Sequence, residues 1–219
     1  MTILTTRNEI VTSKKIIGSE IASIQKACYD EDILQYYKDD HEEDLYWEQF
    51  DCWNNEIIPM ITFNKIIGLN HSDLTTFASK LSEKLVELFH TIHANGFIII
   101  SHLKLDFFGN RKNNFKPLKE AYRKLEEITG NTTYKEAFEI ETDDISVFID
   151  ILFWITRCDP SIAEYIFLFD KDEQIQINIC KYGNIHLTEY HKEQLTASKL
   201  KELGWKIIEG QEFDQFTTD

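Results

Sequence analysis

The sequence predicts an α+β fold, in which a helical N-terminal two-thirds packs with a small antiparallel sheet towards the C-terminus. Apolar residues recur at helical spacing up to about residue 159, and β-type alternation replaces that period afterwards. The 219 residues are 42 % hydrophobic and include only three prolines and eight glycines, so a sizeable core can form without an evident linker. We expect one domain over 1–219, with a possible subdomain seam near 130–144.

Two helices are expected in the first quarter of the chain. The first, over 19–38, has its apolar residues near helical spacing. The second, over 42–53, aligns Tyr46, Phe50 and Trp53 at i, i+4 and i+7. Most of its acidic residues then lie on the opposite arc, as in an amphipathic helix.

The most strongly patterned helix is expected over 73–94, where six apolar side chains form one stripe and Gly96 can end the helix. A strand with at least one buried face follows at 97–107. Another helix begins at Pro117, a residue that suits the first helical turn. The very apolar helix over 144–159 has few polar positions and is expected in the middle of the core.

The C-terminal part changes to alternating and β-branched residues. Segments 164–170, 174–180 and 184–190 are expected to form three short strands of an antiparallel meander. A short helix over 196–203 and a last strand at 205–208 complete the expected elements.

Charge is the most unusual property of the composition. The net charge is −15, and residues 30–56 hold eleven acidic residues and one lysine. Such a field repels phosphate backbones and attracts cationic molecules, so we expect no direct binding of nucleic acid. The N-terminus lacks a secretory signal pattern and the apolar runs are shorter than a membrane span, so a cytoplasmic protein without membrane contact is expected.

Motifs for catalysis or cofactor binding are missing from the sequence. The cysteines at 28, 52, 158 and 180 form no CxxC pair, and no GxSxG, P-loop, GxGxxG or HExxH pattern occurs. We therefore expect free thiols, no cofactor, no metal and no enzymatic activity. One alternative is a metal-dependent enzyme that uses Glu87, His90 and His93, which contain a single Glu-x-x-His element.

A cysteine nucleophile is a further alternative. Cys180 and His186 lie in adjacent expected strands, close to Glu189 and Asp159, so a contact between thiol and imidazole is conceivable. Cys180 has apolar neighbours, however, and burial raises the pKa of a thiol. We expect that Cys180 packs in the core.

The acidic segment is unusual because its carboxylates alternate with large aromatic rings. Tyrosine and tryptophan often anchor protein interfaces, while carboxylates steer a basic partner. A simpler interpretation is a solvated face on two helices whose rings all point inward. The expected contact residues for a partner are Tyr36, Tyr37, Asp39, Asp40, Glu42, Glu43, Asp44, Tyr46 and Trp47.

This acidic character, together with the passage "FWITRCDPSIAEYIFLFD" and the following "INICKYGNIHL", resembles the immunity proteins of bacterial polymorphic toxin systems, such as contact-dependent growth inhibition. The resemblance implies a cytoplasmic, non-enzymatic inhibitor that binds a cognate toxin domain and blocks its active site. A basic nuclease is the implied partner, because nuclease clefts attract phosphates and therefore also an acidic surface. The alternative is an acidic nucleic-acid mimic that acts on a DNA- or RNA-binding protein, with its carboxylates spaced along an extended ridge.

Overall fold

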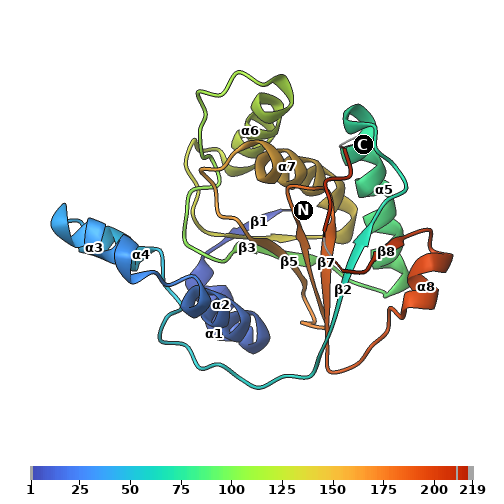
Figure 1. Cartoon of the computed structure of the whole chain (residues 1–219), viewed down its shortest axis with the longest axis horizontal. Coiled ribbons are helices and arrows are strands. Elements are labelled where there is room, and N and C mark those ends of the chain that lie inside the picture. The colour runs from blue at the N-terminus through green and yellow to red at the C-terminus, as the bar shows by residue number, and fades with distance from the viewer. Residues whose placement is uncertain (1, 211, 217–219) are drawn as a thin grey trace.

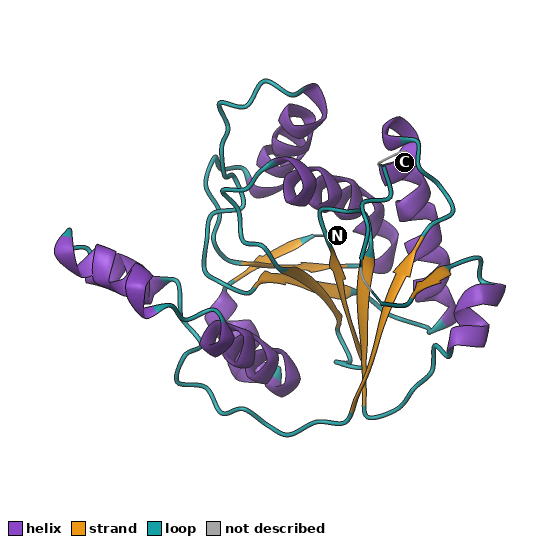
Figure 2. Cartoon of the chain, in the orientation of Figure 1, coloured by secondary structure: helices purple, strands orange, loops and turns teal. Residues whose placement is uncertain are grey.

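One eight-stranded antiparallel sheet forms the centre of the protein in a computed structural model, which describes residues 2–210 and 212–216. Figure 2 shows the strands of this sheet in orange, and their order across the sheet is β1, β4, β3, β5, β6, β7, β2 and β8. The strand bounds are Ile3–Thr5 (β1), Thr62–Gly68 (β2), Phe97–Ser101 (β3), Ala137–Ile140 (β4), Ile166–Asp170 (β5), Ile175–Ile179 (β6), Ile185–Tyr190 (β7) and Lys206–Ile208 (β8).

The helices lie on both faces of this sheet (Figure 1). Helices α5, α6 and α7 cover one face, α1 and α2 lie against the other, and α3 and α4 project away from the body. No helix of the described residues is long and apolar enough to cross a membrane. The helix bounds are Arg7–Ser13 (α1), Lys15–Ala27 (α2), Glu31–Asp39 (α3), Glu43–Glu48 (α4), Leu74–Thr91 (α5), Lys116–Thr129 (α6), Ile145–Cys158 (α7) and Ala197–Glu202 (α8), with a 3-10 turn at Thr142–Asp144.

Alternate residues of the central strands enter two different cores, as the period of two in a strand requires. Ile99 of β3 and Leu168 of β5 belong to the larger core, beneath α5 and α7. Ile98 and Phe169 belong to the smaller core, which α1 and α2 cover. Strands β3 and β5 are therefore buried on both faces, which explains their nearly continuous apolar sequences.

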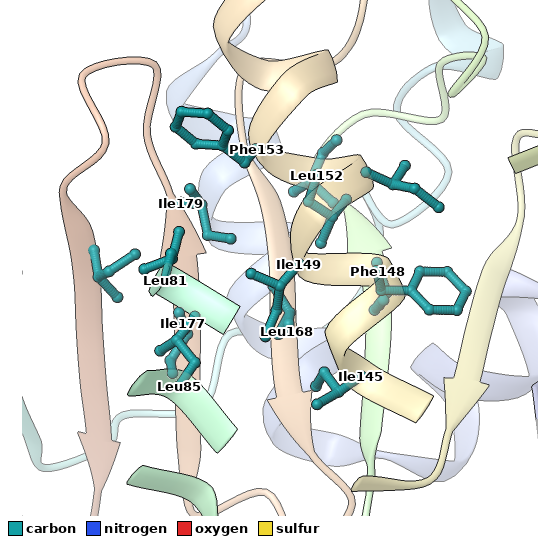
Figure 3. Close-up of a cluster of buried hydrophobic side chains, with 14 of the residues drawn as sticks. Leu81, Leu85, Ile145, Phe148, Ile149, Leu152, Phe153, Leu168, Ile177 and Ile179 are labelled. Carbon is teal, nitrogen blue, oxygen red and sulfur yellow. The ribbon is translucent and has the colours of Figure 1, made fainter. Parts of the chain in front are cut away.

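Helix α7 lies in the middle of the larger core, as its apolar sequence predicts. Eight of its 14 residues are buried. Figure 3 shows the side chains of α7 and α5 next to one another, with both sets facing those of the sheet. The labelled residues are Ile145, Phe148, Ile149, Leu152 and Phe153 of α7, Leu81 and Leu85 of α5, and Leu168, Ile177 and Ile179 of the sheet.

The mixed α+β class is confirmed, but the expected small C-terminal sheet is wrong. The sheet takes strands from the whole chain, and β1, β2 and β4 were missed in the sequence. β1 has only three residues, and β4 has four. β4 pairs with both β1 and β3, so the segment 130–144 supplies an internal strand of the sheet. The helices also extend to residue 202 and are not confined to the N-terminal part.

Three expected helices differ in their bounds. The helix expected over 19–38 is divided into α2 and α3, because the Asp30 carboxylate accepts hydrogen bonds from the backbone N–H groups of Asp32 and Ile33 and starts a new helix. The helix expected over 42–53 is shorter, since α4 ends at Glu48. The strongest expected helix is α5, but it ends at Thr91 instead of 94.

Candidate functional site

Residues 29–53, which we call the acidic hairpin, form a pair of short helices that extends from the body (Figure 1). Inside it, Leu34, Tyr46 and Phe50 are buried in a small core of their own. The rings of Tyr46 and Phe50 lie 4.8 Å apart between centroids. The partly buried members of this cluster are Tyr29, Tyr37, Trp47, Trp53 and Leu103. The acidic hairpin is therefore a packed unit with an aromatic interior, and its aromatic content is partly explained by that packing.

Tyr46 belongs to this interior, which corrects its expected place among the contact residues. Its side chain is 3 % exposed. The Tyr46 hydroxyl donates to the carbonyl of Asp30 (3.1 Å) and accepts from the backbone N–H of Asp30 (3.2 Å). Burial raises the pKa of this hydroxyl. Tyr46 thus joins α4 to the start of α3 and is not available to a partner, consistent with its i, i+4 spacing to Phe50.

Tyr37 and Trp47 are half-buried and support the same interior. The Tyr37 hydroxyl accepts a hydrogen bond from Nε2 of Gln49 (3.3 Å). The Trp47 indole N–H donates to Glu43 (3.3 Å), and the ring stacks on Tyr29 with a centroid separation of 6.1 Å. Each of the two rings therefore has one edge in solvent, while its other edge packs inside the hairpin and stabilises it.

Tyr36 points outward and is the most exposed large apolar side chain of the chain's described part, at 73 %. Ile33, one turn earlier on α3, is 48 % exposed, and Leu45 on α4 is 50 % exposed. Ile33 and Tyr36 share a helix face because they are three residues apart. Ile33 and Leu45 were not among the contact residues expected from the sequence. The sequence does hold a signal for Ile33, because Ile33 and Leu34 are adjacent and only one of them can face α4.

The five expected acidic contacts, Asp39, Asp40, Glu42, Glu43 and Asp44, are all exposed at the turn between α3 and α4. Residues 30–48 contain nine carboxylates in total, and two of these form ion pairs with described residues. These pairs join Glu43 to Lys38 (3.8 Å) and Glu48 to Lys135 (3.4 Å). The carboxylates are concentrated on helices of nine and six residues, which differs from the extended ridge of a nucleic-acid mimic.

The base of the acidic hairpin is fixed to the body by a buried arginine. Arg7, at 1 % exposure, binds both carboxylate oxygens of Asp51 at 2.7 and 3.0 Å and donates to the carbonyl of Ser101 (2.6 Å). Gln25 also donates to Asp51 (3.0 Å) and accepts from the backbone N–H of Cys52 (2.9 Å). Burial alone would raise the pKa of Asp51, but the hydrogen bonds and charge of Arg7 outweigh it and lower that pKa. The hairpin is therefore held in one orientation.

The residues of the expected alternative metal site do not converge. The Glu87 carboxylate binds Nζ of Lys84 at 2.6 Å. His90 is exposed in the last turn of α5, and His93 lies beyond the end of that helix with a left-handed φ of 57°. No cluster of potential metal ligands in the described part of the chain includes these three residues. The expectation that all three share one helix is wrong, because the helix ends at Thr91.

Cys180 and His186 do lie close together, but neither carboxylate expected near them reaches the imidazole. Glu189 is buried and paired with Lys65 (3.0 Å), and Asp159 accepts hydrogen bonds from Tyr122 and from backbone N–H groups. Glu212 takes that place instead, with its carboxylate 3.2 Å from Nε2 of His186. Burial raises the pKa of the Cys180 thiol to about 11, which disfavours a nucleophilic thiolate. Glu212 is 26 residues further along the chain than His186, so the sequence gave no signal for it.

No protein-family model, curated protein or solved structure matches the chain. The acidic hairpin is consequently interpreted from its own residues and geometry.

Proposed function

We propose that the protein is a non-enzymatic inhibitor of the immunity-protein type, which binds a basic toxin domain, a nuclease, and blocks its active site. The observation that carries this proposal is the exposed pair Ile33 and Tyr36 on a projecting helix that is surrounded by carboxylates. Exposed apolar side chains within a polar rim are the pattern of a protein interface. Tyr36 and Ile33 would be the anchors, and the carboxylates would direct the basic partner to them.

The charge of the acidic hairpin suits a cationic partner for a physical reason. Like charges this close repel one another, and few of them are neutralised within the described residues. A basic surface relieves that repulsion and is attracted over about 8–10 Å at physiological ionic strength. Association should therefore be fast at low salt and slow markedly as salt is added.

The fixed base of the hairpin favours binding as well. A surface that is ordered before binding loses less conformational entropy when it docks. Arg7, Gln25 and Asp51 provide that order at the base, and the interior ring cluster provides it along the two helices. The structure of the hairpin thus supports a preformed docking element in preference to a flexible acidic tail.

The test is a binding measurement with the product of the gene immediately upstream, where a toxin gene is expected for an immunity protein. One variant replaces Asp39, Asp40, Glu42 and Asp44 with lysine, and a second is Tyr36→Ala. The matched control replaces four exposed acidic residues of the body with lysine, namely Asp143, Asp172, Glu202 and Glu209.

We expect the hairpin charge reversal to slow association by at least about tenfold, because steering changes association rates by 10–10³. Tyr36→Ala should mainly speed dissociation, and a large anchor of this kind is worth about 2 kcal/mol or more. The control should keep most of its affinity despite the same change in net charge. Equal losses in both charge variants, or no binding of the upstream product, would contradict the proposal.

A further inference from the structure

A second cluster of functional side chains lies at the end of the hairpin formed by β6 and β7, away from the acidic hairpin. In this pair of strands Asn178 is opposite His186 and Ile179 is opposite Ile185. The backbone N–H of Cys180 then donates to the carbonyl of Asn184 (2.9 Å), which extends the pairing by one residue. Cys180 and His186 are therefore diagonal neighbours on one face of the sheet.

The C-terminal segment places a third side chain, Glu212, next to Cys180 and His186. Gln215 is buried and donates to the carbonyl of Gly183 (2.6 Å) and to the side chain of Asn184 (3.0 Å). Asn184 in turn donates to Oε2 of Glu212 (3.4 Å) and to the carbonyl of Phe213 (3.1 Å). These bonds hold the segment across the end of the two strands and place the Glu212 carboxylate.

The geometry distinguishes a catalytic triad from a metal site. In a triad the carboxylate and the nucleophile contact different nitrogens of the histidine. Here one oxygen, Oε2 of Glu212, lies 3.2 Å from Nε2 of His186 and 3.5 Å from Sγ of Cys180. The carboxylate oxygen therefore contacts both other side chains, and all three ligand atoms lie within 4.8 Å of one another, close enough to share one ion.

Two of the three separations between the ligand atoms agree with those around a tetrahedral zinc ion. Zinc bonds of about 2.3 Å to sulfur and about 2.0–2.2 Å to nitrogen and oxygen imply separations of roughly 3.6 Å between sulfur and oxygen and roughly 3.4 Å between nitrogen and oxygen. The observed values are 3.5 and 3.2 Å, and all three ligand atoms lie within 4.8 Å of one another. No other cluster of this kind occurs among residues 2–210 and 212–216.

We propose that Cys180, His186 and Glu212 bind a zinc ion and leave its fourth position open to the adjoining pocket. A thiolate and an imidazole together select zinc over magnesium or calcium, which prefer oxygen ligands. The pocket has a volume of about 440 Å³, and Asn178 and Tyr165 are among its lining residues. A solvent water would complete the coordination, and the Cys180 thiol would release its proton to the solvent on binding the metal.

Zinc at this position would join the C-terminal segment to the β6–β7 pair. The site lies outside the acidic hairpin and does not depend on the function proposed above. Either proposal can fail without the other.

The experiment is a titration of the full-length protein with cobalt(II), after treatment with a chelator and its removal. Cobalt is a spectroscopic substitute for zinc, and a bound thiolate gives a charge-transfer band in the near ultraviolet. We expect a saturable band at one cobalt per chain, which excess zinc removes. Far-ultraviolet circular dichroism of each variant reports whether it is folded.

Loss of an outer-shell partner weakens metal binding by roughly 10–100-fold, so loss of a direct ligand should weaken it by at least about 100-fold. Cys180→Ser should abolish the band, and His186→Gln and Glu212→Gln should weaken cobalt binding to this extent. The matched controls are Cys158→Ser, another half-buried thiol, and Glu209→Gln, an exposed carboxylate nearby in sequence. An absent band in the folded wild type, a band that survives Cys180→Ser, or an equal loss in the controls would overturn the proposal.

Discussion

The ion pair between Arg7 and Asp51 offers the sharpest test of how the acidic hairpin is held. Asp51→Asn keeps the shape of the side chain but removes the charge that faces the guanidinium. The Arg7 side chain is 1 % exposed, so its positive charge would remain buried without a counter-charge. Breaking a buried pair by removing one partner destabilises a protein by about 3–5 kcal/mol.

The expected loss lies at the lower end of that range. The Asp51 side chain is 21 % exposed, so water can reach the site and partly screen the charge. An asparagine can also keep one hydrogen bond from Arg7. We therefore expect a decrease of about 3 kcal/mol in the free energy of unfolding, which corresponds to a lower melting temperature by about 6–12 °C for a chain of this size.

The pH dependence gives this prediction a second readout. The pKa of Asp51 is lowered in the folded protein, because Arg7 outweighs the effect of burial. A carboxylate with a lowered pKa stabilises the fold at pH values above its ordinary pKa of about 3.9, and this stabilisation is lost as the pH falls through the folded value. The difference in stability between wild type and Asp51→Asn should be constant from pH 7 to about pH 5 and should shrink below about pH 4.

Urea unfolding at several pH values, followed by tryptophan fluorescence, measures both quantities. The control is Asp40→Asn, an exposed aspartate of the same hairpin without an ion pair to a described residue. It should change the stability by less than about 0.5 kcal/mol. The reasoning is refuted if Asp51→Asn behaves like this control, or if its effect does not shrink in acid.

Two glycines and one tryptophan give further predictions for the free energy of unfolding. Gly130→Ala should lose about 1–2 kcal/mol, because Gly130 has a φ of 66° but open space around the added methyl group. Gly183→Ala should lose about 2–4 kcal/mol, since its φ is 81° and the methyl group would also lie 2.9 Å from the ring of Phe216. A loss for Gly183→Ala no larger than for Gly130→Ala would contradict the steric part of this argument. Trp205→Phe should lose only the packing of the removed ring, about 1–2 kcal/mol, because the buried indole N–H has no hydrogen-bond partner among residues 2–210 and 212–216; a loss above about 3 kcal/mol would count against it.

Long periodic segments were predictable from the sequence because their side-chain pattern is local. The stripe of α5 and the apolar helix α7 follow directly from residue spacing, as do the three strands β5, β6 and β7. The position of β4 between β1 and β3 was not predictable, because it depends on pairing between segments that are distant in sequence, such as Ile3 with Glu139 and Phe97 with Ile140. The edge strand β1 has only three residues, which is too short for a period to be visible in the sequence.

The candidate sites, too, were predictable from the sequence only in part. Composition located the acidic contacts correctly on the surface, but which rings reach solvent depends on how α3 packs on α4. Tyr36 and Tyr37 are neighbours in sequence, yet one is exposed and the other is half-buried. Glu212 reaches His186 because the side chains of Gln215 and Asn184 fix the C-terminal segment, which no local pattern encodes.

The surface charge of the acidic hairpin accounts for the need for a well-packed interior. Its nine carboxylates between residues 30 and 48 oppose folding by mutual repulsion, so the aromatic cluster around Tyr46 and the buried anchor at Arg7 are needed to hold the two helices together. If the surface of the acidic hairpin contacted only water, the hairpin would need aromatic rings in its interior alone. The exposed Ile33 and Tyr36 contribute nothing to that interior, and an unbound apolar pair on a strongly acidic helix has no stabilising effect in water. The partner contact proposed above would account for both the charge and these two side chains, and the Tyr36→Ala variant tests it directly.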